Sequence, residues 1–286
     1  MEVIKRYAFL VVTLSSFIIF PTPCLLAHMT PMGDGELSDV SGQSGVSLDI
    51  IGSAHITLDS FWIGDSSLTV DHRVEFKELV IDDGAGQNFT FATDDQPITF
   101  DVGTNPFNSS QTVALITGSA AVRPRYVSVG SMVFCNEDIG SLALQSITEN
   151  DRSIEFSSHA GGGCGIDFQH ASRIDIAAIQ YTYNNQPQSL LLSGVHFCQS
   201  ASGAPEDPST WTFDGSFKIG DMSNGNPGTL DIGTSVSSGN TTMILNAPMQ
   251  GDIRINSVDF GGNAFGPCAI DGLAIHRLNI QLLTGI

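Results

Sequence analysis

Apolar and polar residues alternate along most of this chain from Val46 onward. The alternation is clearest where every second residue is apolar, in segments 46–50, 89–91, 98–102, 142–144, 174–176, 230–232 and 253–255. A period of two directs successive side chains to opposite faces of a strand, so that one face is buried and the other meets solvent. The chain offers no convincing amphipathic helix longer than about three turns. The pattern therefore predicts an all-β fold.

Turns rich in glycine, asparagine and aspartate separate the alternating segments, for example at 82–86, 161–163 and 223–228. Glycine and asparagine accept the positive φ that many hairpin turns require. Strands that recur at this spacing indicate a large antiparallel β-sandwich, a barrel or a β-solenoid-like stack of sheets with glycine-rich turns. The same spacing argues against a parallel α/β core.

The N-terminus is organised like a secretory signal peptide. Lys5 and Arg6 precede an apolar run from Ala8 to Phe20, and a small-residue cleavage site ends at Ala27. The run of about 13 residues is shorter than the roughly 18 that a membrane-spanning helix needs, and no later stretch is long enough. We therefore expect an exported protein without a transmembrane segment.

The domain boundaries that follow are a signal peptide at 1–27, a flexible mature N-terminal segment at 28–44, and an all-β domain at 45–286. The β domain has possible halves at 45–108 and 109–286. About 259 residues after cleavage are enough to bury a sizeable core, as one large β domain or as two smaller ones.

The chain is strongly acidic, with 30 acidic and 11 basic residues. Cleavage after Ala27 removes Glu2, Lys5 and Arg6, which leaves 29 acidic and 9 basic residues and a net charge of −20 with histidines neutral. Such a charge repels nucleic acid and anionic lipid, so we expect neither as a partner. It also keeps an exported protein soluble.

Four cysteines follow the cleavage site: Cys135, Cys164, Cys198 and Cys268. In an oxidising compartment an even number favours disulfides, and four cysteines allow three pairings. We expect two structural disulfides and leave the pairing open. A metal site is the alternative, although no two of these cysteines have the C-x₂₋₄-C spacing of a zinc knuckle.

One pattern suggests nucleophilic catalysis. Gly64-Asp65-Ser66-Ser67 resembles the nucleophile block of GDSL-type serine hydrolases, and Asp167 and His170 follow it three residues apart, in that family's order. A histidine oriented by aspartate would take the serine proton. The hydrolase fold, however, surrounds a parallel sheet with helices, and its Gly-x-Asn-Asp block has no match here. A serine esterase is therefore a third hypothesis for the function, after the two given at the end of this section.

Two further sets of residues could bind ligands. Calcium could bridge carboxylates of the turn aspartates Asp82, Asp83, Asp94, Asp95 and Asp101. We expect no other cofactor. Their spacing matches no EF-hand loop, so solvated carboxylates are the default. The only tryptophans, Trp62 and Trp211, could stack on sugar rings if they are exposed, or could be buried in the core.

The segment Gly35–Ile50 reads Gly-Glu-Leu-Ser-Asp-Val-Ser-Gly-Gln-Ser-Gly-Val-Ser-Leu-Asp-Ile. It resembles the stretch that FilA-like, pilus-associated exported proteins of Gram-negative bacteria carry after the signal peptide. The resemblance implies a role in surface structure, adhesion or appendage assembly, with other envelope or appendage proteins as partners and no catalytic residues. It also implies a location in the periplasm, at the outer-membrane surface or outside the cell.

Leu37 and Val40 are spaced to share one face of a short helical turn, an apolar handle that could dock on a partner. A disordered N-terminus is the alternative. The leading expectation for the whole chain is thus an exported surface-structural or adhesion protein without catalysis. A secreted module that binds carbohydrate or another small ligand is the runner-up.

Overall fold

The computed structural model describes residues 47–64, 73–93, 97–104, 112–118, 125–158, 165–184, 189–234 and 241–283. All of them belong to one compact unit, Ser38–Ile286. The predicted signal peptide, the segment 28–44 and the docking candidates Leu37 and Val40 lie outside the described residues.

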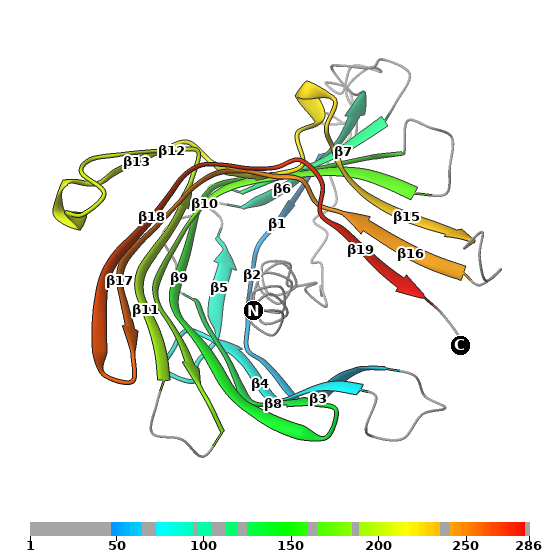
Figure 1. Cartoon of the computed structure of the whole chain (residues 1–286). Helices are drawn as coiled ribbons and strands as arrows, with labels where there is room; N and C mark the ends of the chain where they lie inside the picture. Colours follow the sequence, from blue (N-terminus) through cyan, green and yellow to red (C-terminus); the bar gives the residue numbers. More distant parts are fainter. Residues whose placement is uncertain are drawn as a thin grey trace. The chain divides into compact units, whose positions relative to one another are not determined.

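Strands dominate the described residues, and their order along the chain is shown in Figure 1. The first ten are β1 (Ser47–Ile50), β2 (Gly52–Ala54), β3 (Ile56–Gly64), β4 (Arg73–Asp82), β5 (Phe89–Ala92), β6 (Ile98–Thr104), β7 (Thr112–Gly118), β8 (Arg125–Phe134), β9 (Glu137–Ser158) and β10 (Gly165–Thr182). The others are β11 (Ser189–Cys198), β12 (Ser200–Ser202), β13 (Thr212–Asp214), β14 (Phe217–Ile219), β15 (Gly228–Thr234), β16 (Thr241–Asn246), β17 (Met249–Phe260), β18 (Asn263–Ile275) and β19 (Asn279–Leu283). Two 3-10 turns, η2 (Pro208–Thr210) and η3 (Met222–Asn224), separate some of them.

Within the described residues, fifteen strands form one antiparallel sheet with two branches that share β9 and β10. The first branch has the order β3-β4-β8-β9-β10-β11-β17-β18, and the second has the order β1-β6-β7-β9-β10-β15-β16-β19. Strand β14 bridges β10 and β17. The predicted all-β class with a large antiparallel sheet is confirmed.

The two branches exist because β9 and β10 are long enough to change partners midway. Residues 137–147 of β9 pair with β8, whereas residues 152–157 pair with β7. Residues 174–182 of β10 pair with β11, whereas residues 165–168 pair with β15. A register shift between Ala171 and Arg173 marks a β-bulge at this change of partner, and bulges bend the strand that carries them.

In the core of the first branch, the apolar residues of the alternating segments are buried, as the sequence pattern predicts. Leu142 and Leu144 on β9 and Ile174 and Ile176 on β10 are all buried. A smaller core cluster consists of Phe217 on β14, Ala247, and Met249 at the start of β17. In Figure 1 the strands β9, β10, β11, β17 and β18 curve together side by side.

Strand pairing crosses the boundary suggested between residues 108 and 109. Strand β4 pairs with β8, and β6 pairs with β7. Each of these pairs joins a strand from 45–108 to a strand from 109–286. Among the described residues, no helix is long and apolar enough to cross a membrane.

Candidate functional site

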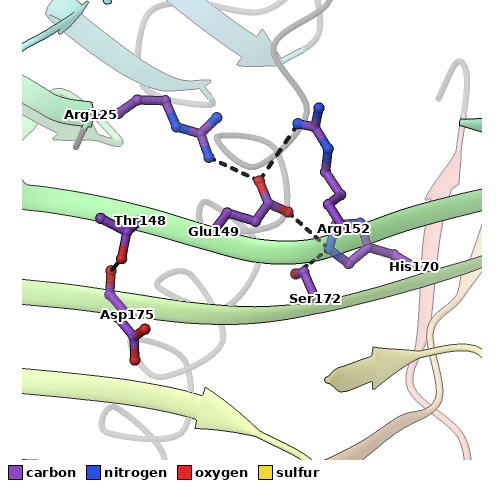
Figure 2. A network of polar contacts seen from close by, with 7 residues as sticks. All are labelled: Arg125, Thr148, Glu149, Arg152, His170, Ser172 and Asp175. Atoms are coloured by element: carbon purple, nitrogen blue, oxygen red, sulfur yellow. Dashed lines mark hydrogen bonds and ion pairs between the residues drawn. The ribbon is translucent and has the colours of Figure 1, made fainter. Parts of the chain in front are cut away.

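A buried cluster of charged side chains surrounds Glu149 at the point where β9 and β10 change partners (Figure 2). Arg125 donates from Nη2 to Oε2 of Glu149 at 3.0 Å, and Nη1 of Arg152 lies 3.6 Å from the same oxygen. The other oxygen, Oε1, lies 3.4 Å from Nε2 of His170. His170 in turn shares a 2.8 Å hydrogen bond with Oγ of Ser172, the residue at the β-bulge.

In this corner cluster, formed by Arg125, Glu149, Arg152, His170 and Ser172, the carboxylate of Glu149 is shared by two arginines. Burial raises the pKa of Glu149, but contact with His170 and the positive charges of Arg125 and Arg152 outweigh burial and lower it to about 2. Glu149 is therefore ionised at every physiological pH. Burial lowers the pKa of Arg152, although the nearby carboxylate of Glu149 opposes that change.

The same cluster contains a serine, a histidine and a carboxylate, yet its geometry is not that of a catalytic triad. Ser172 and Glu149 both approach the Nε2 atom of His170. A triad needs the serine on one ring nitrogen and the carboxylate on the other. Ser172 is also fully buried. The cluster links β8, β9 and β10, because Arg125 on β8 and His170 on β10 both contact Glu149 on β9.

A second polar row crosses the first branch further along. Asp175 on β10, His196 on β11 and Arg254 on β17 lie opposite one another in successive strand pairs. Nδ1 of His196 lies 2.6 Å from Oδ1 of Asp175, and Nη2 of Arg254 lies 2.6 Å from Oδ1 of Asp271 on β18. The row therefore contains two close side-chain contacts, one between β10 and β11 and the other between β17 and β18.

The hairpin from Ser200 to Asp214, formed by β12, η2 and β13, packs its aromatic side chains on this row. Phe213 stacks on His196 with ring centroids 4.2 Å apart. Trp211 lies under the guanidinium of Arg254, 5.2 Å from carbon to ring centroid, and its indole nitrogen donates to the carbonyl of Ala204 at 2.7 Å. The row is thus covered by the protein's own aromatic residues.

The two tryptophans proposed for sugar stacking have different environments. Trp211 is buried in the contact just described, so its face is not open to a sugar ring. Trp62 is 45% exposed and lies on β3. Only Trp62 therefore retains the exposure that stacking on a ligand requires.

Strand β3 is an edge of the first branch, and it exposes apolar side chains. Within the described residues it pairs with β4 alone. Leu58, Phe61 and Trp62 are between 42% and 45% exposed. The strand contains no proline and no lysine, and eight of its nine residues, all but Asp59, pair with β4 in one constant register. Such an edge is a template for another strand.

The opposite edge of the first branch, β18, is irregular. Pro267 lacks the N–H that a new neighbour would accept, and Gly266 and Gly272 have φ values of 91° and 66°. Its pairing with β17 contains three register shifts. Proline and bulges are the features by which sheet proteins discourage pairing at an edge. The two edges of this branch therefore differ in their suitability for a partner strand.

The two predicted disulfides are not present among the described cysteines. Cys135, Cys198 and Cys268 are free thiols, and Cys164 lies outside the described residues. Cys198 and Cys268 pair with β17 from opposite sides. Two strand spacings of about 4.8 Å separate their Cα atoms by about 10 Å, beyond the limit of about 7 Å for a disulfide.

The hydrolase pattern does not assemble in the described residues. Asp167 and His170 lie three apart on β10, so strand alternation directs them to opposite faces. His170 instead contacts Glu149 and Ser172. Ser66 lies outside the described residues.

Those calcium candidates that the structure describes, Asp82, Asp83 and Asp101, do not form a group of metal ligands either. Asp82 and Asp83 accept hydrogen bonds from backbone N–H groups of their own turn, at 2.7 Å from Gly84 and 2.8 Å from Ala85. Asp101 lies on β6, and Asp94 and Asp95 lie outside the described residues. No group of three or more possible metal ligands occurs in the part of the chain that the structure describes.

The comparisons with known proteins give one partial match. The model of a family of unknown function, DUF6160, matches residues 1–104. Of the described strands, this region contains β1 to β6, including the exposed edge strand β3. No curated protein and no solved structure matches the chain.

Proposed function

We propose that this protein is an exported structural or adhesion protein of the cell surface, and that it acts by joining other envelope or appendage proteins rather than by catalysis. The observation that carries the proposal is the regular, apolar edge strand β3, whose Leu58, Phe61 and Trp62 face solvent. An extended segment added to such an edge gains main-chain hydrogen bonds and side-chain contacts together.

The N-terminal sequence supports the same proposal. The basic residues Lys5 and Arg6, followed by the apolar run 8–20, have the pattern of a secretory signal peptide. The following segment Gly35–Ile50 resembles pilus-associated exported proteins of the FilA type. The acidic composition, with 30 acidic and 11 basic residues, favours protein partners over nucleic acid and anionic lipid.

Fractionation of the producing cell tests the location. Cytoplasm, periplasm, outer membrane, sheared appendages and medium are blotted for the protein. Recovery with the outer membrane or the sheared material is expected. Recovery only as a free monomer in the periplasm or medium would contradict the structural role. Deletion of the gene is expected to weaken adhesion or appendage assembly, and unchanged adhesion and appendages would also contradict the proposal.

A second candidate function is binding of carbohydrate through Trp62. The exposed indole on β3 is the specific observation that favours it, because a flat aromatic face stacks on sugar rings. Titration with a glycan panel should then shift the tryptophan fluorescence of a Trp211→Phe variant, in which Trp62 is the only tryptophan. A Trp62→Phe variant, which retains only the buried Trp211, is the matched control and should not respond.

A further inference from the structure

The edge strand β3 is self-complementary in one antiparallel register. Ser60 is the central residue of Ile56–Gly64. A two-fold axis through Ser60 would pair all nine residues with a second copy of the same strand. Leu58 would then lie opposite Trp62 of the second copy, and by symmetry Trp62 would lie opposite Leu58. Cross-strand apolar and aromatic pairs of this kind stabilise sheets.

The charge on the strand selects the same register. Asp59 is the only charged residue of β3, and in the register centred on Ser60 it faces Phe61 of the second copy. A shift of the axis to Asp59 would place the two carboxylates directly opposite each other, which is unfavourable. A shift to Phe61 would gain one Phe61–Phe61 pair, but it would place Leu58 opposite Gly64 and Trp62 opposite Ser60, so both Leu58–Trp62 pairs would be lost. The central register therefore avoids like charges and retains the apolar pairs.

We infer that β3 pairs antiparallel with β3 of a second copy of this chain, in the register centred on Ser60, and joins the two first branches into one continuous sheet. The inference deepens the proposed function by naming the partner of the edge strand, and it rests on that function's edge-strand argument. Such a contact is isologous, because each copy presents the same surface. The irregular edge β18 remains outside it.

Electrostatics gives the contact a recognisable salt dependence. Each processed copy carries 29 acidic and 9 basic residues, a formal net charge of −20 with histidines neutral, so the copies repel at low ionic strength. Salt screens this repulsion, because the Debye length falls to about 8 Å at 0.15 M. The dimer should therefore strengthen as salt is raised. A complex with a basic partner would weaken under the same conditions.

The test is the mass of the processed, exported protein in solution. Light scattering after size exclusion should show twice the monomer mass at 0.5 M salt. Leu58→Lys should raise the dissociation constant at least tenfold. Ile270→Lys is the matched control, since Ile270 is also 43% exposed but lies on β18. A wild-type monomer at every salt and protein concentration, or disruption by Ile270→Lys rather than Leu58→Lys, would overturn the inference.

A charge swap tests the register itself. Ser60→Glu and Ser60→Lys each place two like charges face to face across the two-fold axis, so each variant alone should be monomeric. An equimolar mixture should recover the dimer, because glutamate then faces lysine. Failure of the mixture to associate, with both variants folded by circular dichroism, would contradict this register. These measurements do not depend on where the cell places the protein, so they can fail while fractionation still supports a surface role.

Discussion

The side chain of Glu149 is the central charge of the corner cluster, because it contacts Arg125, Arg152 and His170. It is the shared ion-pair partner of two arginines that are themselves largely buried, with side-chain exposures of 11% for Arg125 and 14% for Arg152. A buried ion pair is weak evidence for net stability, but removal of one partner leaves a charge without compensation. The cluster therefore makes the corner sensitive to single substitutions.

Substitution of Glu149→Gln should lower the free energy of unfolding by about 3 kcal/mol, because Arg125 and Arg152 would lose their shared carboxylate. Urea unfolding followed by circular dichroism measures the change. Glu137→Gln is the control, because Glu137 begins the same strand β9 but is exposed. Equal, small effects of the two substitutions would show that the cluster does not stabilise the corner.

The lowered pKa of Glu149 predicts a defined dependence on acid. Its pKa is about 2 in the folded state, against an ordinary value of 4.5. The resulting stabilisation is complete above pH 4.5 and is lost as the pH falls toward 2. The difference in stability between wild type and Glu149→Gln should therefore shrink over this interval. Thermal unfolding at pH 6, 4.5, 3 and 2 measures it, and a constant difference would contradict the assignment.

The cysteines should react according to their burial. Burial, with a smaller contribution from Asp252, raises the pKa of Cys198 to about 11, and the thiolate is the reactive form. Iodoacetamide at pH 8 should label the exposed Cys135 in the folded protein and Cys198 only after denaturation. Peptide mapping by mass spectrometry reads this out. If Cys135 is labelled only after treatment with a reductant, it is disulfide-bonded and this prediction is wrong.

At the scale of elements, the hairpin Ser200–Asp214 depends on a small number of contacts. Trp211 and Phe213 hold it on the polar row, and Asp252 accepts the backbone N–H of Ala201 at 2.7 Å. The same carboxylate accepts the N–H of Gly272 on β18 at 2.7 Å. The hairpin is therefore anchored by side chains at its base and near the end of β13.

Substitution of Trp211→Ala should release this hairpin. It removes a buried aromatic, a contact worth about 3 kcal/mol, together with the stacking under Arg254. A glutamate-specific protease should then cut after the exposed Glu206 at least ten times faster than in wild type. Trp62→Ala is the control, since Trp62 lies on the exposed edge. Equal cleavage in both variants would show that Trp211 does not anchor the hairpin.

At the scale of the whole molecule, the sheet combines hairpins, such as β6–β7 and β9–β10, with pairings between distant parts of the chain, such as β4–β8, β7–β9 and β11–β17. Strands β9 and β10 join both branches, and β4 and β6 depend on β8 and β7 for one of their neighbours. The pairings between distant strands close long loops and form slowly. The two branches are therefore unsuited to fold separately.

Separate expression of residues 45–108 and 109–286 should give no folded product, because the cut removes the neighbours of β4 and β6 and bares the edges of β7 and β8. Bare edges of this kind aggregate. Circular dichroism and solubility, compared with those of 45–286, measure the outcome. Two soluble, cooperatively unfolding halves would contradict a single sheet as the folding unit.

The sequence by itself determined the all-β class, because the period of two is a local property of each strand. Leu142, Leu144, Ile174 and Ile176 alternate in sequence and are buried in the structure. It also determined the net charge, which depends on composition alone. Neither property requires knowledge of which strand lies beside which.

Only the tertiary structure decided which polar residues meet. Glu149 joins Arg125 across 24 residues and His170 across 21 because β8, β9 and β10 are neighbours, and no local pattern encodes that order. The separation of Cys198 from Cys268 and the burial of Trp211 follow from strand order in the same way. Likewise, the place of β3 at an edge of the described sheet depends on which strands the rest of the chain pairs with one another, and no local pattern encodes that.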